Sequence, residues 1–314
     1  MRKNNSIILL AIIAFFIALN ISKHKVAAVV DTQAVSHTSL SNKINNVVPI
    51  NASGTKYLFE YKQDRINQDN KKQAQLDTLE KRIKTLVGDN INNFGMVYYD
   101  INSKKSITIN EDKQFLAAST IKVPINMLMY DMVKEKKIDI NEKLKYDKVD
   151  FEDGAGVLQG TDLSKPIAIK TLSDLSIIYS DNIAINMLLR KVGIENRYNY
   201  IEKIVGHPIT HDGNNITPMD SSKILERLYS NPNNNKYYKD IIKAMKNTEY
   251  HDRIDKYIPQ KIVAHKIGDF APYVNDTAIV CNDNPYVLVV FTKGINDADD
   301  LIAQVSKMIY DAKK

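Results

Sequence analysis

The spacing of apolar residues predicts helices through most of the chain. Leu76, Leu79, Ile83 and Leu86 recur every three or four residues and are followed by Gly88, which indicates an amphipathic helix from about Gln73. Residues 119 to about 250 are mostly of helical period, with polar, turn-forming stretches at 145–166 and 207–218. A last helix is predicted over 297–312, where Leu301, Val305 and Ile309 share one face.

Strand patterns lie on both sides of this helical middle. Residues 94–101 and 106–110 read as two strands joined by a polar turn, and three more strands are predicted over the ranges 262–266, 275–281 and 286–292. Strands from both chain ends imply one antiparallel sheet flanked by helices, next to an all-α part. We therefore expect an α/β protein of the α+β kind, with a helical subdomain at about 119–250 and an active site between the two parts.

The N-terminal segment has the pattern of an export signal. Arg2 and Lys3 precede an apolar run over 7–19, which is short for a membrane-spanning helix. Residues 26–28 are a candidate cleavage site, but basic residues lie just before it, so a cleaved signal and a retained anchor both stay open. We expect residues 1–28 to be a signal peptide or membrane anchor, 29–70 a polar linker and 71–314 one globular domain. The protein is then extracytoplasmic, either secreted or anchored to the membrane.

Composition narrows the classes of partner. Hydrophobic residues make up 44% of the chain, enough for a sizeable core, and the net charge of +6 is spread without a basic stripe. We therefore expect no nucleic-acid partner, membrane contact through the N-terminal segment alone, and a monomer. A single cysteine, Cys281, excludes an internal disulfide and a cysteine metal site. His207 and His211 flank Pro208 in a turn-like stretch, so neither a metal nor another cofactor is expected.

Candidate chemistry begins at Ser119 and Lys122. Apolar residues from Ile121 to Met132 follow the period of a buried helix, so Ser119 is expected at its first turn with Lys122 on the same face. A serine three residues before a lysine is common by chance. Taken alone it is more typical of a helix cap and a solvated lysine.

Two further motifs change this interpretation. Ser180-Asp181-Asn182 lies 61 residues after Ser119 and opens an apolar helix, and Lys266-Ile267-Gly268 follows Ser180 by 86 residues on a β-rich run. In order, spacing and context, the three motifs resemble those of class A β-lactamases and penicillin-binding proteins. The resemblance extends from about residue 72 to the C-terminus.

The resemblance implies a serine hydrolase that opens a β-lactam amide through an acyl-enzyme. Ser119 would be the nucleophile, Lys122 the base, and Ser180 the proton relay to the leaving nitrogen, while Lys266 would help to depress the pKa of Lys122. These four are the expected catalytic residues. The expected substrate-binding residues are Asn182, Gly268 and Asp269, with an oxyanion hole from the backbone N–H groups of Ser119 and Asp269. The substrate would be a β-lactam or a D-Ala-D-Ala-like peptide.

Three departures from the family pattern affect the expected activity. Class A enzymes carry a Glu-x-x-Leu-Asn loop whose glutamate activates the hydrolytic water, but residues 213–216 here read Gly-Asn-Asn-Ile. Glu195 begins a similar-looking stretch that lies too early, on the preceding helix. Ile267 removes a hydroxyl that helps to hold a substrate carboxylate, and Asp269 replaces a small residue. Its charge would either weaken the field of Lys266 or turn to solvent without effect.

These departures leave two alternatives to a true β-lactamase. One is a slow-deacylating penicillin-binding protein of the D,D-peptidase kind, because deacylation has no evident base. The other is a non-catalytic module that binds cell wall or β-lactam. The full set of Ser119, Lys122, Ser180, Asn182 and Lys266 argues against the second alternative, since a binder needs no complete nucleophile set.

Overall fold

The computed structural model describes residues 52–313. The chain divides into two units, Met1–Asn67 and Gln68–Lys314, and the second is the one described below. The predicted signal or anchor and the predicted linker up to residue 51 lie outside the described residues. How the chain divides into domains stays a prediction.

Helix α3 (Ala52–Val87) begins well before Gln73, so the predicted helix start is wrong by about 20 residues. Residues 61–70 are all exposed, including Tyr61 and Ile66, so they bury no apolar stripe that a period could reveal. From residue 76 onward the helix packs into a core through Leu76, Leu79 and Ile83. The 3-10 helix η1 (Gly88–Asn93) follows, and Gly88 adopts the left-handed φ of 56° at the helix end.

The central sheet confirms the prediction of an antiparallel sheet built from both chain ends. Its strand order is β2-β1-β9-β8-β7, and every neighbouring pair is antiparallel. The strands are β1 (Phe94–Asp100), β2 (Ser106–Ile109), β7 (Val263–Phe270), β8 (Tyr273–Val280) and β9 (Tyr286–Lys293). The two central pairings share β9, in which Val289 is paired with Val97 on one side and with Thr277 on the other.

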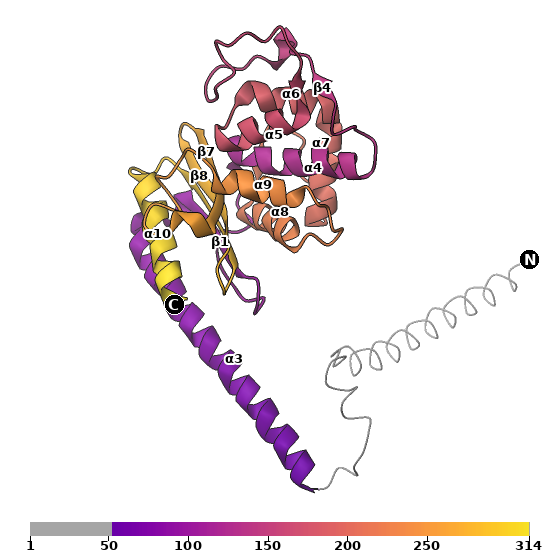
Figure 1. The fold of residues 1–314 in the computed structure, drawn as a ribbon. Coiled ribbons are helices and arrows are strands. Elements are labelled where there is room, and N and C mark those ends of the chain that lie inside the picture. The colour runs from indigo at the N-terminus through magenta and orange to yellow at the C-terminus, as the bar shows by residue number, and fades with distance from the viewer. Residues whose placement is uncertain (1–51, 314) are drawn as a thin grey trace, which may run out of the picture. The chain divides into compact units, whose positions relative to one another are not determined.

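Both faces of the sheet are buried, against different helices. Leu288 and Val290 of β9 belong to the core formed with α3 and with α10 (Ala298–Ala312). Val287 and Val289, which alternate with them along the strand, belong to the core of the helical part. This alternation follows from the two-residue period of a strand. Figure 1 shows α10 on one side of the sheet and helices α4 to α9 gathered on the other.

The helical part confirms the α+β prediction, and the described residues hold eight α-helices in all. Its helices are α4 (Lys122–Lys134), α5 (Ile169–Ile178), α6 (Asn182–Val192), α7 (Ile194–Val205), α8 (Pro218–Ser230) and α9 (Tyr238–Lys246). The short elements before, between and after these helices are η2 (Ala118–Ile121), η3 (Lys148–Asp150), η4 (Gln260–Ile262), and the strand pairs β3 (Phe115–Leu116) with β6 (Asn215–Ile216) and β4 (Lys143–Leu144) with β5 (Ile167–Ala168). Among the described residues, no helix is both long and apolar enough to cross a membrane.

Candidate active site

Ser119 lies in the 3-10 turn η2, and Lys122 is the first residue of α4. The expectation that Ser119 occupies the first turn of the α-helix is therefore wrong, because Ser119 lies in the 3-10 turn that immediately precedes α4. Ala118 before it has a left-handed φ of 49°, and Asn275 of β8 anchors the incoming strand by donating to Leu116 O at 2.8 Å. The Ser119 side chain is half-buried, and its hydroxyl makes no hydrogen bond to any described residue. It is therefore free to meet a substrate.

Gly268 lets strand β7 approach this turn closely. A Cβ on Gly268 would lie 2.5 Å from Ala117 O and 3.0 Å from the Thr120 side chain. The third motif therefore needs glycine at this position because the backbone of the nucleophile turn occupies the space of a side chain. Gly268 thus positions the nucleophile turn against the strand.

The Lys122 ammonium is buried and faces the second motif. Its Nζ donates to Ser180 O at 2.5 Å, to Asn182 Oδ1 at 2.7 Å and to Ser180 Oγ at 3.2 Å. Burial lowers the pKa of Lys122 to about 8, against an opposing effect of the Glu152 and Asp181 charges. The lowered pKa makes the neutral amine, which can accept a proton, far more accessible near neutral pH than in an ordinary lysine.

Lys266 completes the cluster from the third motif. It is fully buried, and its Nζ donates to Ser180 Oγ at 3.0 Å and to Ile267 O at 3.1 Å. Burial, reinforced by the charge of Lys122, lowers the pKa of Lys266 well below its usual value. The Ser180 oxygen thus accepts from two ammonium groups, which leaves its own proton for a third partner.

Asp181, between Ser180 and Asn182, holds a loop over the site. Its Oδ1 caps α6 by accepting from Ala184 N at 2.8 Å, and its Oδ2 accepts from Val157 N and Leu158 N, both at 2.7 Å. Asn182 holds the same loop, since its Nδ2 donates to Asp153 O at 3.1 Å and its N to Ala155 O at 3.0 Å. The sequence predicted a loop over 145–166, but not its place at the site, because residues 153–158 carry no motif.

Asp269 does not simply turn to solvent, and its charge is not left unpaired beside Lys266. Both of its carboxylate oxygens accept from Arg253 Nη2, at 2.7 and 2.8 Å. Arg253 is buried, and it also donates to Asp299 Oδ1 at 2.7 Å and to Asn275 O at 2.8 Å. Sequence reasoning missed Arg253 because it belongs to no motif. Its charge compensates Asp269 at the edge of the site.

The segment before α8 lies against the strand that leads to Ser119. Residues 215–216 pair with 115–116, and Ala117 N donates to Asn214 O at 2.8 Å. The Asn214 side chain is in turn held by Arg197 Nη1 at 2.8 Å. This segment therefore brings amides, and no carboxylate, next to the nucleophile turn.

The acidic and histidine residues around that segment are otherwise engaged or exposed. His207 contacts Asp220 at 2.9 Å, and His211 contacts Glu202 at 3.0 Å and Glu195 at 3.5 Å. The two histidines thus have separate carboxylate partners. Glu195 is exposed on α7.

Glu152 is a further acidic residue that sequence reasoning missed. Its Oε2 accepts from Asn186 Nδ2 at 2.9 Å, and its charge raises the pKa of Lys122 against the effect of burial. Asn186 lies one helical turn after Asn182 on α6, so the two side chains share one face of that helix. This shared face is the sequence signal that could have placed Asn186, and with it Glu152, near the site.

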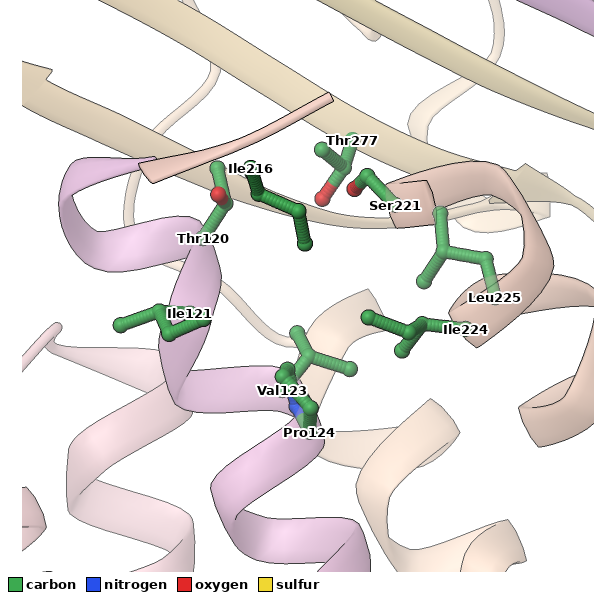
Figure 2. A pocket seen from close by; sticks show the side chains of 9 residues that line it. All are labelled: Thr120, Ile121, Val123, Pro124, Ile216, Ser221, Ile224, Leu225 and Thr277. Atoms are coloured by element: carbon green, nitrogen blue, oxygen red, sulfur yellow. The ribbon is translucent and has the colours of Figure 1, made fainter. Parts of the chain in front are cut away.

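A small cavity lies behind the nucleophile turn. It measures about 10 Å³ and is lined mainly by apolar side chains of η2, α4 and α8, together with the side chains of Thr120, Ser221 and Thr277. Figure 2 shows these side chains around the cavity. A space of this size holds at most about one water molecule, so it is not a substrate pocket.

Comparisons with known proteins agree with this geometry. A family model described as the beta-lactamase enzyme family matches residues 78–312. β-Lactamase BRO-1 of Moraxella catarrhalis is 28% identical over 228 residues, which cover 63% of this chain and 73% of that protein. β-Lactamase SME-1 of Serratia marcescens is 26% identical over 274 residues, or 75% of this chain and 89% of that protein.

Solved structures agree on the fold. PBP-A is 25% identical with a TM-score of 0.69, over 75% of this chain and 96% of PBP-A. A variant of the reconstructed class A β-lactamase of the last common ancestor of Gram-negative bacteria has a TM-score of 0.66 at 20% identity, over 75% of this chain and 98% of that one. With the family model spanning most of the chain, this protein belongs to the β-lactamase enzyme family and is a serine hydrolase of the β-lactamase type.

Proposed function

We propose that this protein is an exported serine hydrolase that opens the amide bond of β-lactams through an acyl-enzyme on Ser119. One observation carries the proposal. The Ser180 hydroxyl lies between two buried ammonium groups, at 3.2 Å from Lys122 and 3.0 Å from Lys266, while the Ser119 hydroxyl makes no hydrogen bond to a described residue. A surface-binding module would have no use for two buried lysines, because burying each ammonium costs stability.

Acylation follows from these contacts. Neutral Lys122 accepts the Ser119 proton as Ser119 Oγ bonds to the substrate carbonyl carbon. The resulting oxyanion is bound by the backbone N–H groups of Ser119 and Asp269, the latter on β7, whose outer amides have no strand partner because β7 is the sheet edge. The carbon–nitrogen bond then breaks. Ser180 donates its proton to the leaving nitrogen and regains one from Lys122.

The charges of the site favour an anionic substrate. Lys266 and Arg253 are buried cations at this edge of β7, and Asp269 is already paired with Arg253. A β-lactam and a D-Ala-D-Ala-like peptide both carry a carboxylate next to the scissile amide, so both fit this field. The β-lactamase relatives BRO-1 and SME-1, and a PBP-A mutant whose structure is an acyl-enzyme complex with penicillin G, support β-lactams as one substrate class.

The slow-deacylating alternative rests on the segment that pairs with the nucleophile strand. Hydrolysis of the ester needs a water and a base within hydrogen-bond reach, and residues 213–216 carry no carboxylate. Mixing with a chromogenic cephalosporin is then expected to give a stoichiometric burst followed by slow turnover. Linear turnover without a burst, lost in Asp212→Asn, would identify Asp212 as a deacylation base and exclude this alternative.

Intact-mass spectrometry after incubation with penicillin G tests the main proposal. We expect a covalent adduct equal to the mass of the drug, on a peptide that contains Ser119, and no adduct in Ser119→Ala. Hydrolysed drug without an accumulated adduct would indicate efficient turnover. If neither an adduct nor hydrolysed drug is found, the result would support the non-catalytic binding module.

Export is part of the same proposal and is tested separately. The basic residues 2–3 and the apolar run over 7–19 support an extracytoplasmic location. Cell fractionation followed by N-terminal sequencing of the native protein would distinguish a cleaved signal from a retained anchor. Recovery of the full-length chain in the cytoplasmic fraction would contradict export.

A further inference from the structure

A second cluster of ionisable side chains lies on β7, next in sequence to Lys266 and on the opposite face of the strand. His265 is fully buried and precedes Lys266, so the two side chains point to opposite sides of the sheet. His265 faces the segment between α9 and β7, which supplies His251 and Asp255. The three-motif chemistry does not use any of these three residues.

Three potential metal-ligand atoms meet in this cluster. His251 Nδ1 lies 2.5 Å from Asp255 Oδ2, and His265 Nε2 lies 3.2 Å from the same oxygen. One ligand atom from each residue falls within 4.8 Å of the other two. An ion about 2.0–2.2 Å from each ligand needs donor atoms roughly 3–4 Å apart, so the His265–Asp255 separation already fits and the His251–Asp255 contact would lengthen on binding.

Asp276 of β8 orients the buried histidine from behind. Both of its carboxylate oxygens contact His265 Nδ1, at 3.1 and 2.9 Å, and they also accept from Thr277 N at 2.8 Å and Ile254 N at 3.1 Å. Asp276 is therefore fixed as an acceptor, and Nδ1 of His265 donates to it. Nε2 is then the ring nitrogen that faces Asp255. A carboxylate behind a histidine is the usual second layer of a metal site.

Two buried atoms of the cluster have no hydrogen-bond partner. They are His265 Nε2, which lies near Asp255 without hydrogen-bond geometry, and Asp255 Oδ1. Both side chains are almost completely buried, with 1% of each exposed. Unsatisfied buried polar atoms are costly and rare, so two of them within one cluster call for a bound group.

We propose that His251, Asp255 and His265 bind a divalent transition-metal ion of the zinc type. Histidine nitrogen and carboxylate oxygen are the ligands that such ions prefer, and two plus charges balance the two carboxylates, Asp255 and Asp276. Asp255 Oδ1 or a water can supply the fourth ligand. The His251 side chain is 38% exposed, which gives the ion a path from solvent.

The ion would fasten residues 251–258 to the face of β7 that lies behind the active site. This segment also carries Arg253, which pairs with Asp269, and Ile254, whose carbonyl accepts from Ser306 of α10 at 2.7 Å. We expect the role to be structural, because on the folded chain a bound ion adds its binding free energy to stability. The proposal does not depend on the activity at Ser119.

Metal binding by untagged, chelator-treated protein tests this inference. Titration with Zn²⁺ in a calorimeter, and with Co²⁺ followed by visible absorption, is expected to show one ion per chain and a raised Tm. His251→Ala should weaken Zn²⁺ binding at least ~10-fold, because loss of even an outer partner costs ~10- to 100-fold. This variant leaves the buried residues in place, so it is expected to fold.

His211→Ala is the matched control. His211 is also 38% exposed and also contacts a carboxylate, but it has no second histidine beside it. Its loss should leave Zn²⁺ affinity unchanged. Absence of stoichiometric binding in the wild-type protein, or equal affinity in His251→Ala, would overturn the proposal.

Discussion

His265 and Lys266 are neighbours on one strand, and both are fully buried, yet their pKa values shift in opposite directions. Burial favours the neutral form of each. At Lys266 the nearby Lys122 reinforces burial, and the pKa falls well below its usual value. At His265 the charges of Asp276 and Asp255 outweigh burial and raise the pKa to about 10. The two faces of β7 thus show that the neighbouring charges, and not burial alone, decide the direction of a shift.

The same comparison separates two roles for one strand. The Lys266 face collects cations around a serine hydroxyl, which suits proton transfer and an anionic substrate. The His265 face collects carboxylates around imidazoles, which suits a cation. The four predictions below change one face at a time.

Removing the base on the Lys266 face is expected to have the largest effect. Lys122→Ala should slow acylation by penicillin G by ~10²- to 10⁴-fold, because it removes the expected base and leaves Lys266 as the one remaining described lysine that donates to Ser180 Oγ with a lowered pKa. Stopped-flow mixing or timed intact-mass sampling measures the rate. Acylation at the normal rate would mean that another group takes the Ser119 proton.

On the other face, Asp276→Asn is expected to destabilise the fold by about 3 kcal/mol. Asp276 accepts hydrogen bonds from His265, Thr277 N and Ile254 N in the core. In the variant, the side-chain NH₂ group of asparagine would replace one of the two acceptor oxygens and leave at least one of these N–H groups without an acceptor. Urea unfolding followed by circular dichroism measures the loss. As a control, exposed Asp212→Asn should change stability by less than about 0.5 kcal/mol. Equal stabilities for the two variants would contradict the buried network.

The pH dependence of acylation should follow Lys122. Because only the neutral amine accepts a proton, the acylation rate is expected to rise with pH and level off above the Lys122 pKa of about 8. The free energy of unfolding also rises with pH over this range. The pKa is lowered in the folded state, so the unfolded chain binds the extra proton and stability increases from about pH 8 toward the ordinary lysine pKa. A rate that falls over this range would show that protonated Lys122 is the active form.

Glu152→Gln is expected to have the smallest effect. The Glu152 charge raises the pKa of Lys122, so its removal should move the acylation profile to lower pH, by less than about one unit because the carboxylate is exposed. Asn186 keeps an acceptor in this variant. If the acyl-enzyme instead lasts much longer while the profile stays in place, Glu152 would be acting as a deacylation base.

Much of the fold could be predicted from local pattern. The strands at both chain ends and the helices between them follow periods of two and 3.6 residues, which are set by the backbone and are visible in any window of sequence. The three motifs were also visible, and the structure brings Lys122, Ser180, Asn182 and Lys266 into hydrogen-bonding contact. Their catalytic roles stay predictions.

Tertiary structure alone decided which charges meet. Arg253 donates to Asp269, and the Glu152 charge raises the pKa of Lys122. His251 and His265 both contact Asp255. None of these pairs belongs to one motif or lies on one helix face. The start of α3 was missed for the opposite reason, because residues 61–70 bury no side chain. A sequence reveals its buried faces through periodicity. Contacts between separate segments depend on how the elements pack, so only the folded chain specifies them.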